Sequence, residues 1–412
     1  MIKATRAQWI RFVIVLVLWL VFLVWLKSWM GLLVVPFIFD AYITKKIPWT
    51  WWKKSKNPTV VTVMGWVDAI VFALVAVYFV NLYFFQNYVI PSSSLEKSLL
   101  VGDYLFVSKL SYGPRVPQTP LHMPLAQHTL PVFNCKSYLE FPQWDYKRVK
   151  GLGDVQLNDI VVFNFPAGDT VMANVPNDDI YRMSYQAGKE LTKPVDMAGM
   201  TPEQQRMVFD YYYQAGRKYI DENANTYGKV FVRPVDRREN YVKRCVGLPG
   251  QTLEIKDRVV YLDGKPNKEP DNVQYRYLVK VHKAIPDDLA HELGISREDL
   301  SYYYPEASAY NIPLTEKAKA GLLARKDIVA GIENVPGDDA GGLYPLNKLT
   351  GWTTDNYGPL WIPKKGETIQ LTLDNLPIYE RPIRAYEGND LKVKDGKIYI
   401  NGKETNEYTF KM

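Results

Sequence analysis

The sequence has 412 residues, which is long enough for a membrane anchor and one or two globular units. Hydrophobic residues make up 47% of the chain, but its mean hydropathy of -0.20 indicates that most of it lies outside a membrane. The net charge is +6 and the basic residues are scattered, so we expect no nucleic-acid partner. The four histidines and two cysteines show no metal-ligand spacing, and we expect neither a metal nor a cofactor.

Two apolar regions predict a membrane anchor in residues 1–86. The first region, residues 9–43, includes the nearly unbroken apolar run Trp9–Leu26, and it predicts either one membrane span or a hairpin. The second region, residues 60–85, predicts another spanning helix, because a helix of this length covers the ~30 Å apolar core of a bilayer.

A basic loop, residues 44–58, separates these two regions. It contains five lysines and three tryptophans, a combination that is typical of the cytoplasmic edge of a membrane. A hairpin would place Lys3, Arg6 and Arg11 on the same side as this loop, whereas a single span would place them on the other side. The charges favour the hairpin, and both alternatives place the bulk of the chain outside the cytoplasm.

The segment after the anchor predicts a mainly β domain over residues 87–265. Tyr104–Lys109 and Asp159–Pro166 are rich in aromatic and β-branched residues, so each predicts a strand, and the second strand should be buried. Tyr241–Val246 predicts a third strand, and Asp263-Gly264 predicts a hairpin turn.

An insertion interrupts this β domain at about residues 167–235. Within it, Thr201-Pro202-Glu203 combines a helix cap with a proline at the first helical position, and it predicts a helix that ends near Glu222.

A second insertion, residues 266–363, predicts a cap with short helices that begin at Pro286 and Pro313. Residues 364–412 then return to the β domain. The expected fold class is α+β: a membrane-anchored, mainly β domain with N-terminal transmembrane helices and a helical or irregular inserted cap.

Three consecutive serines, Ser92–Ser94, lie on the first polar loop after the second apolar region. A serine hydroxyl becomes a good nucleophile only when a base removes its proton. No histidine lies near this loop in the sequence, and we pair it instead with Lys243, which has apolar neighbours on its strand. A lysine acts as a base only when its amine is neutral, and burial favours the neutral form, so Lys243 should be buried. Arg244 should point to the opposite face of the strand, towards solvent or a carboxylate.

Each of these features alone has a simpler interpretation. A serine-rich loop after a helix is usually a turn or a helix cap, and a single lysine on a strand is usually solvated. The cysteines, Cys135 and Cys245, could pair in an oxidising compartment, but two buried free thiols are the expected state.

Together, these segments resemble type I signal peptidase, the leader peptidase that works at the outer face of the cytoplasmic membrane. The resemblance rests on the order of the segments after an anchor and on four motifs: Ile90-Pro-Ser-Ser-Ser-Leu95, Gly102-Asp103, Asn158-Asp-Ile-Val-Val-Phe163 and Tyr241-Val-Lys-Arg-Cys-Val-Gly-Leu-Pro-Gly250. It implies a multi-pass protein of the bacterial inner membrane with its catalytic domain on the periplasmic side. Its implied partners are membrane lipid and the signal peptides of exported preproteins.

The resemblance also implies roles for individual residues. Ser94 would be the nucleophile and Lys243 the general base, and Ser92 would stabilise the oxyanion together with the backbone N–H of Ser94. The shallow pockets for small side chains would be shaped by Ile90, Leu95 and Val242. The implied function is a membrane-bound serine endopeptidase that cleaves N-terminal signal peptides after small residues with a Ser/Lys dyad.

The chain departs from the family pattern in two ways. Leu95 and Lys97 stand where the family usually has Met and Pro. The family also carries a later Gly-Asp-Asn…Ser-x-Asp-Ser-Arg segment, whose Ser and Asp hold the lysine, and this sequence has no such segment. We therefore expect a C-terminally shortened version of a longer enzyme, which has the dyad but cleaves poorly.

Two other classes of function share some of these features. The alternative to the protease is a non-catalytic, membrane-anchored binding module, a degenerate or truncated relative. A transporter subunit is disfavoured, because beyond Arg11 the apolar regions carry only Asp40 and Asp68 and no relay of ionisable groups.

Overall fold

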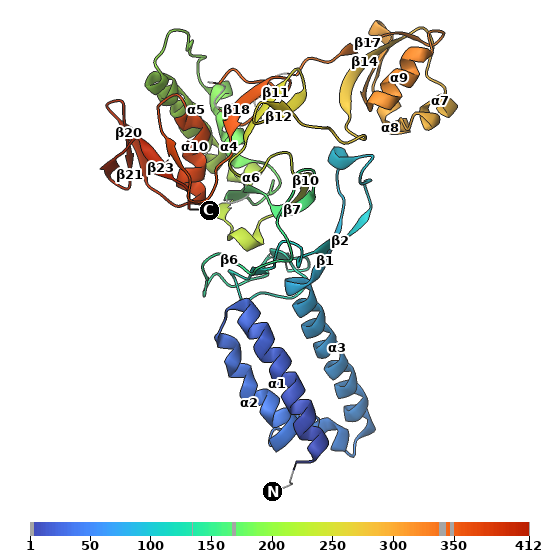
Figure 1. The fold of residues 1–412 in the computed structure, drawn as a ribbon, viewed down its shortest axis with the longest axis vertical. Coiled ribbons are helices and arrows are strands. Elements are labelled where there is room, and N and C mark those ends of the chain that lie inside the picture. The colour runs from blue at the N-terminus through green and yellow to red at the C-terminus, as the bar shows by residue number, and fades with distance from the viewer. Residues whose placement is uncertain (1–3, 134, 167–169, 338–342, 347–349, 412) are drawn as a thin grey trace.

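In the computed structural model, the chain forms a helical stem that carries a strand-rich head (Figure 1). The structure describes residues 4–133, 135–166, 170–337, 343–346 and 350–411. The N-terminal end lies at the far tip of the stem, and the C-terminal end lies in the head. Lys3 therefore falls outside the described residues.

The stem contains two helices that are long and apolar enough to cross a membrane, α1 (Arg6–Leu26) and α3 (Pro58–Tyr83). The side chain of Thr5 accepts a hydrogen bond from the backbone of Gln8 and starts α1, and Asn57 with Pro58 starts α3 in the same way. The second predicted span is thus a helix with nearly the predicted bounds.

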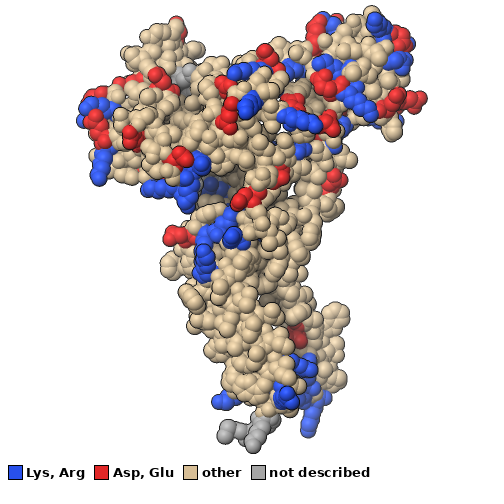
Figure 2. All heavy atoms as spheres, in the orientation of Figure 1, with Lys and Arg blue, Asp and Glu red and all other residues tan. Residues whose placement is uncertain are grey.

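Between these helices the chain folds back along α1, and the crossing of a membrane by this hairpin stays a prediction. The returning arm consists of short helical turns, η1 (Met30–Val34), α2 (Val35–Phe39) and η2 (Asp40–Thr44). The ring of Phe39 packs against the ring of Phe12, with 5.4 Å between the centroids, and Trp19 Nε1 donates to the Gly31 carbonyl at 2.9 Å. The start of α1 and the basic loop, which includes η3 (Trp51–Lys54), consequently lie at the same end of the stem, where basic side chains gather (Figure 2).

Two antiparallel strand pairs of the head contain the three predicted strands. The first pair, β1 (Phe85–Val89) with β2 (Tyr104–Ser108), continues from the end of α3. The second pair is β7 (Ile160–Asn164) with β10 (Asn240–Arg244). All three predicted strands are therefore present, but β7 is not buried as predicted. Its residues are a mixture of exposed and half-buried positions, because β10 is the only strand of the described chain that pairs with it.

Three smaller antiparallel strand pairs complete this part of the head. They are β3 (Arg115–Val116) with β6 (Lys147–Arg148), β4 (Thr129–Leu130) with β5 (Cys135–Lys136), and β8 (Thr170–Met172) with β9 (Val230–Val232). Both cysteines are free; Cys245 is half-buried, but Cys135 is exposed. The prediction of a buried thiol is wrong for Cys135, because its short strand lies at the surface.

A helical hairpin occupies the first insertion. It consists of α4 (Ile180–Leu191) and α5 (Pro202–Glu222), followed by α6 (Ala224–Tyr227) and the turn η6 (Val235–Arg237). The bounds of α5 are those predicted, and the side chains of Thr201 and Gln204 cap its first turn reciprocally. The two helices pack closely because Gly188 and Gly216 let their backbones touch.

A four-stranded sheet, in the order β13-β12-β11-β18, follows β10. Its strands are β11 (Thr252–Lys256), β12 (Val259–Leu262), β13 (Lys265–Pro266) and β18 (Tyr357–Trp361). The predicted turn at Asp263-Gly264 joins β12 to β13, and both of its residues have positive φ, as a tight hairpin turn requires.

The inserted cap is organised around strands and is not helical or irregular as predicted. Its sheet, in the order β15-β16-β14-β17, contains β14 (Tyr275–Val281), β15 (Tyr303–Tyr304), β16 (Ala309–Leu314) and β17 (Val329–Asn334). The helical elements are α7 (Asp287–Glu292), α8 (Arg297–Leu300), η7 (Pro305–Ala307) and α9 (Glu316–Ala324). The helix predicted from Pro286 is thus present, but Pro313 belongs to β16 and the next helix starts after the cap Thr315.

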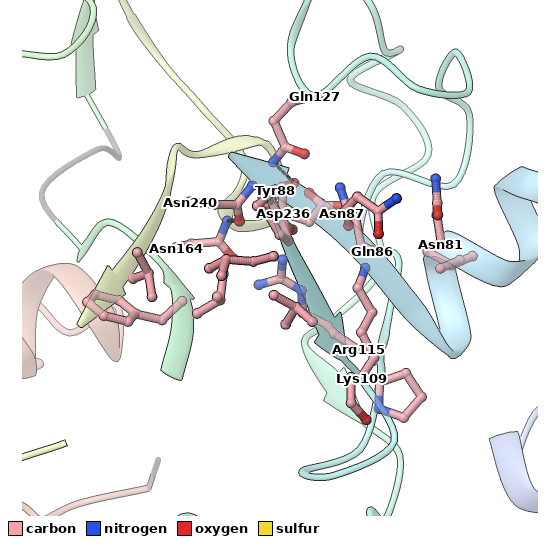
Figure 3. Close-up of a pocket in the computed structure, with 18 of the residues that line it drawn as sticks. Asn81, Gln86, Asn87, Tyr88, Lys109, Arg115, Gln127, Asn164, Asp236 and Asn240 are labelled. Atoms are coloured by element: carbon pink, nitrogen blue, oxygen red, sulfur yellow. Dashed lines mark hydrogen bonds between the residues drawn. The ribbon is translucent and has the colours of Figure 1, made fainter. Parts of the chain in front are cut away.

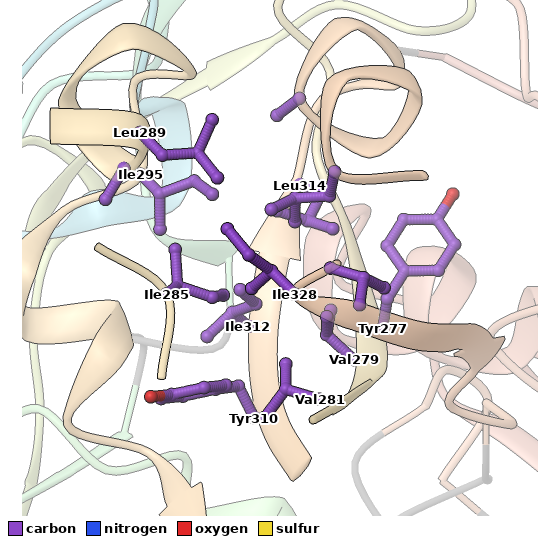
Figure 4. Packing of buried hydrophobic residues seen from close by; sticks show 14 residues of the cluster. Tyr277, Val279, Val281, Ile285, Leu289, Ile295, Tyr310, Ile312, Leu314 and Ile328 are labelled. Carbon is purple, nitrogen blue, oxygen red and sulfur yellow. The ribbon is translucent and has the colours of Figure 1, made fainter. Parts of the chain in front are cut away.

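The cap has its own hydrophobic core, which explains the extra strands. Most side chains of β14 and β16 are buried or half-buried, and those of Val279 and Ile312 are completely buried. They pack against apolar residues of α7, α9 and the connecting loops (Figure 4).

The C-terminal segment forms a second separate core around α10 (Leu376–Arg381) and the turn η8 (Pro382–Tyr386). The strands around it are β19 (Thr368–Gln370) with β23 (Glu407–Thr409), and the sheet of β20 (Leu391–Lys394), β21 (Lys397–Ile400) and β22 (Lys403–Glu404).

Candidate functional site

The three serines lie on a closed loop between β1 and β2, which we call the serine loop (residues 90–103). Two backbone hydrogen bonds close its base, from Ile90 N–H to the Asp103 carbonyl at 3.0 Å and from Gly102 N–H to the Ile90 carbonyl at 2.9 Å. Gly102 has a φ of +91°, a conformation that glycine adopts without strain. The predicted Gly102-Asp103 turn therefore ends the loop and returns the chain to β2.

Ser94 and Lys243 meet although 149 positions separate them in the sequence. Ser94 lies on the short helical turn η4 (Ser93–Leu95), and the Lys243 Nζ atom donates a hydrogen bond to its Oγ atom. The Oγ atom of Ser92 lies 3.4 Å from that of Ser94. The structure thus brings together the nucleophile, base and oxyanion residues that the resemblance implies, while their roles remain predictions.

Lys243 is only half-buried, so the prediction that its strand buries it is wrong. Among the described residues, β10 pairs with β7 alone, and no second strand covers its other edge. Ser94 is likewise exposed. Both side chains are therefore open to a molecule that approaches from outside.

Arg244 supports the serine loop, a contact that sequence reasoning missed. Its guanidinium donates to Ser98 Oγ at 3.0 Å and to the Asn158 carbonyl at 2.8 Å. Its partners are thus a hydroxyl and a carbonyl, where the sequence predicts solvent or a carboxylate. The alternation of side chains along a strand places Arg244 on the face away from Lys243, but no local pattern signals that the serine loop reaches this face.

The start of β7 is tied to the segment after β2 by a second polar contact. Tyr112 Oη donates to Asp159 Oδ2 at 2.6 Å, and the N–H of Gln156 donates to the same oxygen at 2.8 Å. The hydrogen bond from Tyr112 lowers the pKa of Asp159 below its usual value, and it raises the pKa of Tyr112 to about 12.

A cavity of about 1160 Å³ lies between the end of α3, the β1–β2 pair and the β7–β10 pair (Figure 3). Of the three predicted pocket residues, Val242 lines this cavity, whereas Ile90 and Leu95 are not among its lining residues. Ile90 is only 2% exposed and belongs to the base of the serine loop. Within the described part of the chain, no group of three His, Cys, Asp or Glu side chains is arranged to hold a metal ion.

Comparison with known proteins places these features in one family. The family model described as "Signal peptidase, peptidase S26" matches residues 63–290, which is more than half of the chain. The chain is 42% identical to "Signal peptidase I" of Helicobacter pylori (strain ATCC 700392 / 26695) over 56 residues, which are 14% of this chain and 18% of that protein. It is 48% identical to "Signal peptidase I" of Aquifex aeolicus (strain VF5) over 44 residues, which are 11% and 17% of the two chains.

A longer match is to "Signal peptidase I" of Bacillus licheniformis, with 25% identity over 114 residues, which are 28% of this chain and 56% of that protein. The matched segments thus span less than a fifth of the first two relatives and just over half of the third. No solved structure matches this chain.

Proposed function

Since the chain belongs to the signal peptidase family, peptidase S26, we propose that it is a membrane-bound serine endopeptidase that removes signal peptides from exported preproteins after small residues. The observation that carries this proposal is the hydrogen bond between Lys243 Nζ and Ser94 Oγ, on the loop at the far end of the β1–β2 pair that rises from α3 (Figure 1). A nucleophile and a base within hydrogen-bond distance are the minimum that acyl transfer requires.

The reaction would proceed in two halves. In the first, neutral Lys243 takes the proton of Ser94 Oγ while that oxygen attacks the carbonyl carbon of the scissile peptide bond. The resulting oxyanion would be stabilised by the Ser92 hydroxyl and the Ser94 backbone N–H. The tetrahedral intermediate then expels the amine of the mature protein, which receives the proton from Lys243. In the second half, Lys243 activates a water molecule that hydrolyses the acyl-enzyme and restores Ser94.

Substrate binding would also change the surroundings of Lys243. Lys243 is half-buried, and a substrate segment that fills the space beside it would remove water from its amine. Water removal favours the neutral form that a general base needs. We retain Ile90, Leu95 and Val242 as the proposed contacts for small substrate side chains; of the three, Val242 lines the described cavity, which Ser94 and Lys243 do not line.

The arrangement of stem and head supports the proposed location. If α1 and α3 cross the inner membrane with the basic loop on the cytoplasmic side, α3 delivers β1 and the serine loop to the periplasmic surface. A signal peptide is an apolar helix in the same membrane, and the segment that follows this helix would extend beside the β1–β2 pair to bring the cleavage site to Ser94.

The test is cleavage of a preprotein by the chain in phospholipid vesicles. Ser94→Ala and Lys243→Ala should each reduce the cleavage rate by at least about 10³-fold. Ser93→Ala is the matched control, since it removes a neighbouring hydroxyl outside the proposed dyad, and it should cleave normally. Substantial cleavage by either dyad variant would refute the mechanism.

A second candidate function is a non-catalytic, membrane-anchored binding module. The half-exposed state of Lys243 favours it, because a solvated lysine is a poor base. Such a module would bind preproteins but would not react at Ser94, so chemical labelling of that residue separates the two candidates.

A further inference from the structure

The cavity described above has a second end, away from the serine loop, at the junction between the stem and the head. Here its wall is formed by the last turns of α3, including Val77, Tyr78 and Leu82. The backbone N–H of Lys109 donates to the Phe84 carbonyl at 2.7 Å, which fixes Lys109 where α3 passes into β1. This end therefore lies at the head-side terminus of a candidate membrane-spanning helix.

The lining of this end is strongly basic. Four cationic side chains contribute to the cavity: Lys109, Arg115, Arg148 and Arg237. Lys109 and Arg115 project into it (Figure 3), and basic side chains border the hollow between stem and head in the space-filling view (Figure 2).

Each of the two lining carboxylates already pairs with an arginine through one oxygen, and among the described residues the buried Asp236 Oδ1 has no hydrogen-bond partner. Asp236 Oδ2 accepts hydrogen bonds from Thr119 Oγ1 at 2.9 Å and from Arg237 at 3.4 Å, and Glu239 pairs with Arg233 at 3.1 Å. Among the residues that the structure describes, no carboxylate forms an ion pair with Lys109, Arg115 or Arg148. The guanidinium of Arg148 donates instead to the Gly113 carbonyl and to Tyr146.

Burial makes the unpaired charges of Lys109 and Arg115 costly. Desolvation, with smaller contributions from Arg115, Arg148 and Arg237, lowers the pKa of Lys109 to about 8. Desolvation likewise lowers the pKa of Arg115, although nearby Asp236 opposes this effect. An anion between the two side chains would restore the charge balance that the protein itself does not provide.

We propose that this end of the cavity binds the phosphate group of an anionic membrane lipid through Lys109 and Arg115. Guanidinium and ammonium groups are suited to a phosphodiester, and the cavity is large enough for a lipid headgroup. Val77 and Leu82 of α3 border the same space and offer an apolar surface for the start of the acyl chains. If α3 spans the membrane, this end of the cavity lies at the depth of the lipid phosphates. Lipid binding at this site does not require that Ser94 cleave a substrate.

Lipid binding by the purified full chain in detergent, measured by native mass spectrometry, tests this proposal independently of cleavage. Dioleoyl phosphatidylglycerol should bind at least about 10-fold more tightly than dioleoyl phosphatidylcholine, because its headgroup has a net negative charge, whereas the choline cation of phosphatidylcholine neutralises its phosphate and is repelled by Lys109 and Arg115. Lys109→Gln combined with Arg115→Gln should abolish this preference. The matched control, Lys136→Gln combined with Lys150→Gln, removes two exposed basic residues of the same head and should retain it.

Further measurements separate the remaining outcomes. Lys109→Arg combined with Arg115→Lys keeps both charges and should retain the preference, which distinguishes loss of charge from misfolding. Millimolar inorganic phosphate should not displace the lipid; displacement would indicate a site for soluble phosphate and overturn the lipid assignment. Equal binding of the two lipids by the unaltered chain, or an unchanged preference in the Gln double variant, would also overturn it.

Discussion

Arg244 donates a hydrogen bond to Ser98 Oγ at 3.0 Å, so the strand that carries Lys243 also holds the loop that carries Ser94. The same guanidinium donates to the Asn158 carbonyl at 2.8 Å, which fixes its position. We therefore predict that Arg244 is a positioning residue, which acts through the strand and the loop and limits how far the proposed nucleophile and base can separate.

The first prediction concerns this contact. Arg244→Met should lower kcat for preprotein cleavage by about 10- to 100-fold with little change in KM, because small displacements of a reacting group are costly. Ser98→Ala removes only one of the two contacts of Arg244 and should cause a smaller loss. A wild-type kcat for Arg244→Met, or a loss that appears only in KM, would show that Arg244 does not position the dyad.

The backbone at Lys97 gives a second prediction. Lys97 has a φ of +70°, and its carbonyl accepts a hydrogen bond from Asn272 Nδ2 at 3.0 Å. A proline is restricted to a φ near about −65°, so Lys97→Pro should force the serine loop into another conformation. We expect its cleavage rate to fall about 10-fold or more, whereas Lys97→Gly should cleave like the unaltered chain. Equal rates for the two variants would contradict this loop conformation, even though the family pattern has proline here.

Short sequence motifs correctly predict helix starts and turns whose conformation is set by adjacent residues. The cap at Thr201 fixes the start of α5, and Asp263-Gly264 fixes a hairpin turn. The same reasoning fails at Pro313, because tertiary pairing with β14 holds it in a strand. It also fails to predict the exposure of Lys243, because the residues of β10 do not determine how many strands pair with it.

The candidate site is predictable only in part, for the same reason. Spacing alone does not bring Ser94 and Lys243 together; the resemblance to a known family suggests that pair. No such pattern points to Lys109 and Arg115, whose shared environment arises because the end of α3 and the β1–β2 pair enclose them. Cations without an ion pair can be identified only from a structure, which shows the partners of every nearby carboxylate.

A third prediction tests the packing of the helical hairpin. A Cβ atom at Gly216 would lie 1.8 Å from the Ser184 carbonyl oxygen, so Gly216→Ala must push α4 and α5 apart. It should destabilise this unit by at least about 2 kcal/mol, seen as faster hydrogen exchange in both helices. Gly331→Ala is the control, because no atom lies within 4 Å of the added carbon, and exchange in α4 and α5 should not change. Unaltered exchange in Gly216→Ala would contradict the close helix contact.

A fourth prediction follows from the pKa of Lys109, which burial lowers to about 8 from an ordinary value of 10.5. Because the folded state binds this proton less tightly than the unfolded state, charged Lys109 destabilises the fold, fully below about pH 8 and progressively less up to about pH 10.5. Lys109→Met in lipid-free detergent should therefore be more stable than the unaltered chain at pH 7, by at most about 3 kcal/mol. This difference should shrink by pH 10.

The other charged and titratable groups around Lys109 do not explain this change of the stability difference with pH. The unaltered protein and Lys109→Met both contain these groups, so their titration largely cancels in the comparison. The groups are Tyr88, Arg115, His122, Arg148, Asp236, Arg237 and Glu239. Thermal unfolding at pH 7 and pH 10 measures the difference, and a gain in stability that grows with pH would contradict the expected direction of the effect.

The proposed function depends most on Ser94 as a nucleophile that Lys243 activates. The direct measurement is covalent labelling of the purified chain by a serine-reactive acylating probe, with the labelled residue identified by peptide mass spectrometry. We expect one acyl group on Ser94 in the unaltered chain and in Ser93→Ala, and none in Ser94→Ala or Lys243→Ala. Labelling that is absent from the unaltered chain, lies on another residue, or persists without Lys243 would contradict the proposed activation of Ser94.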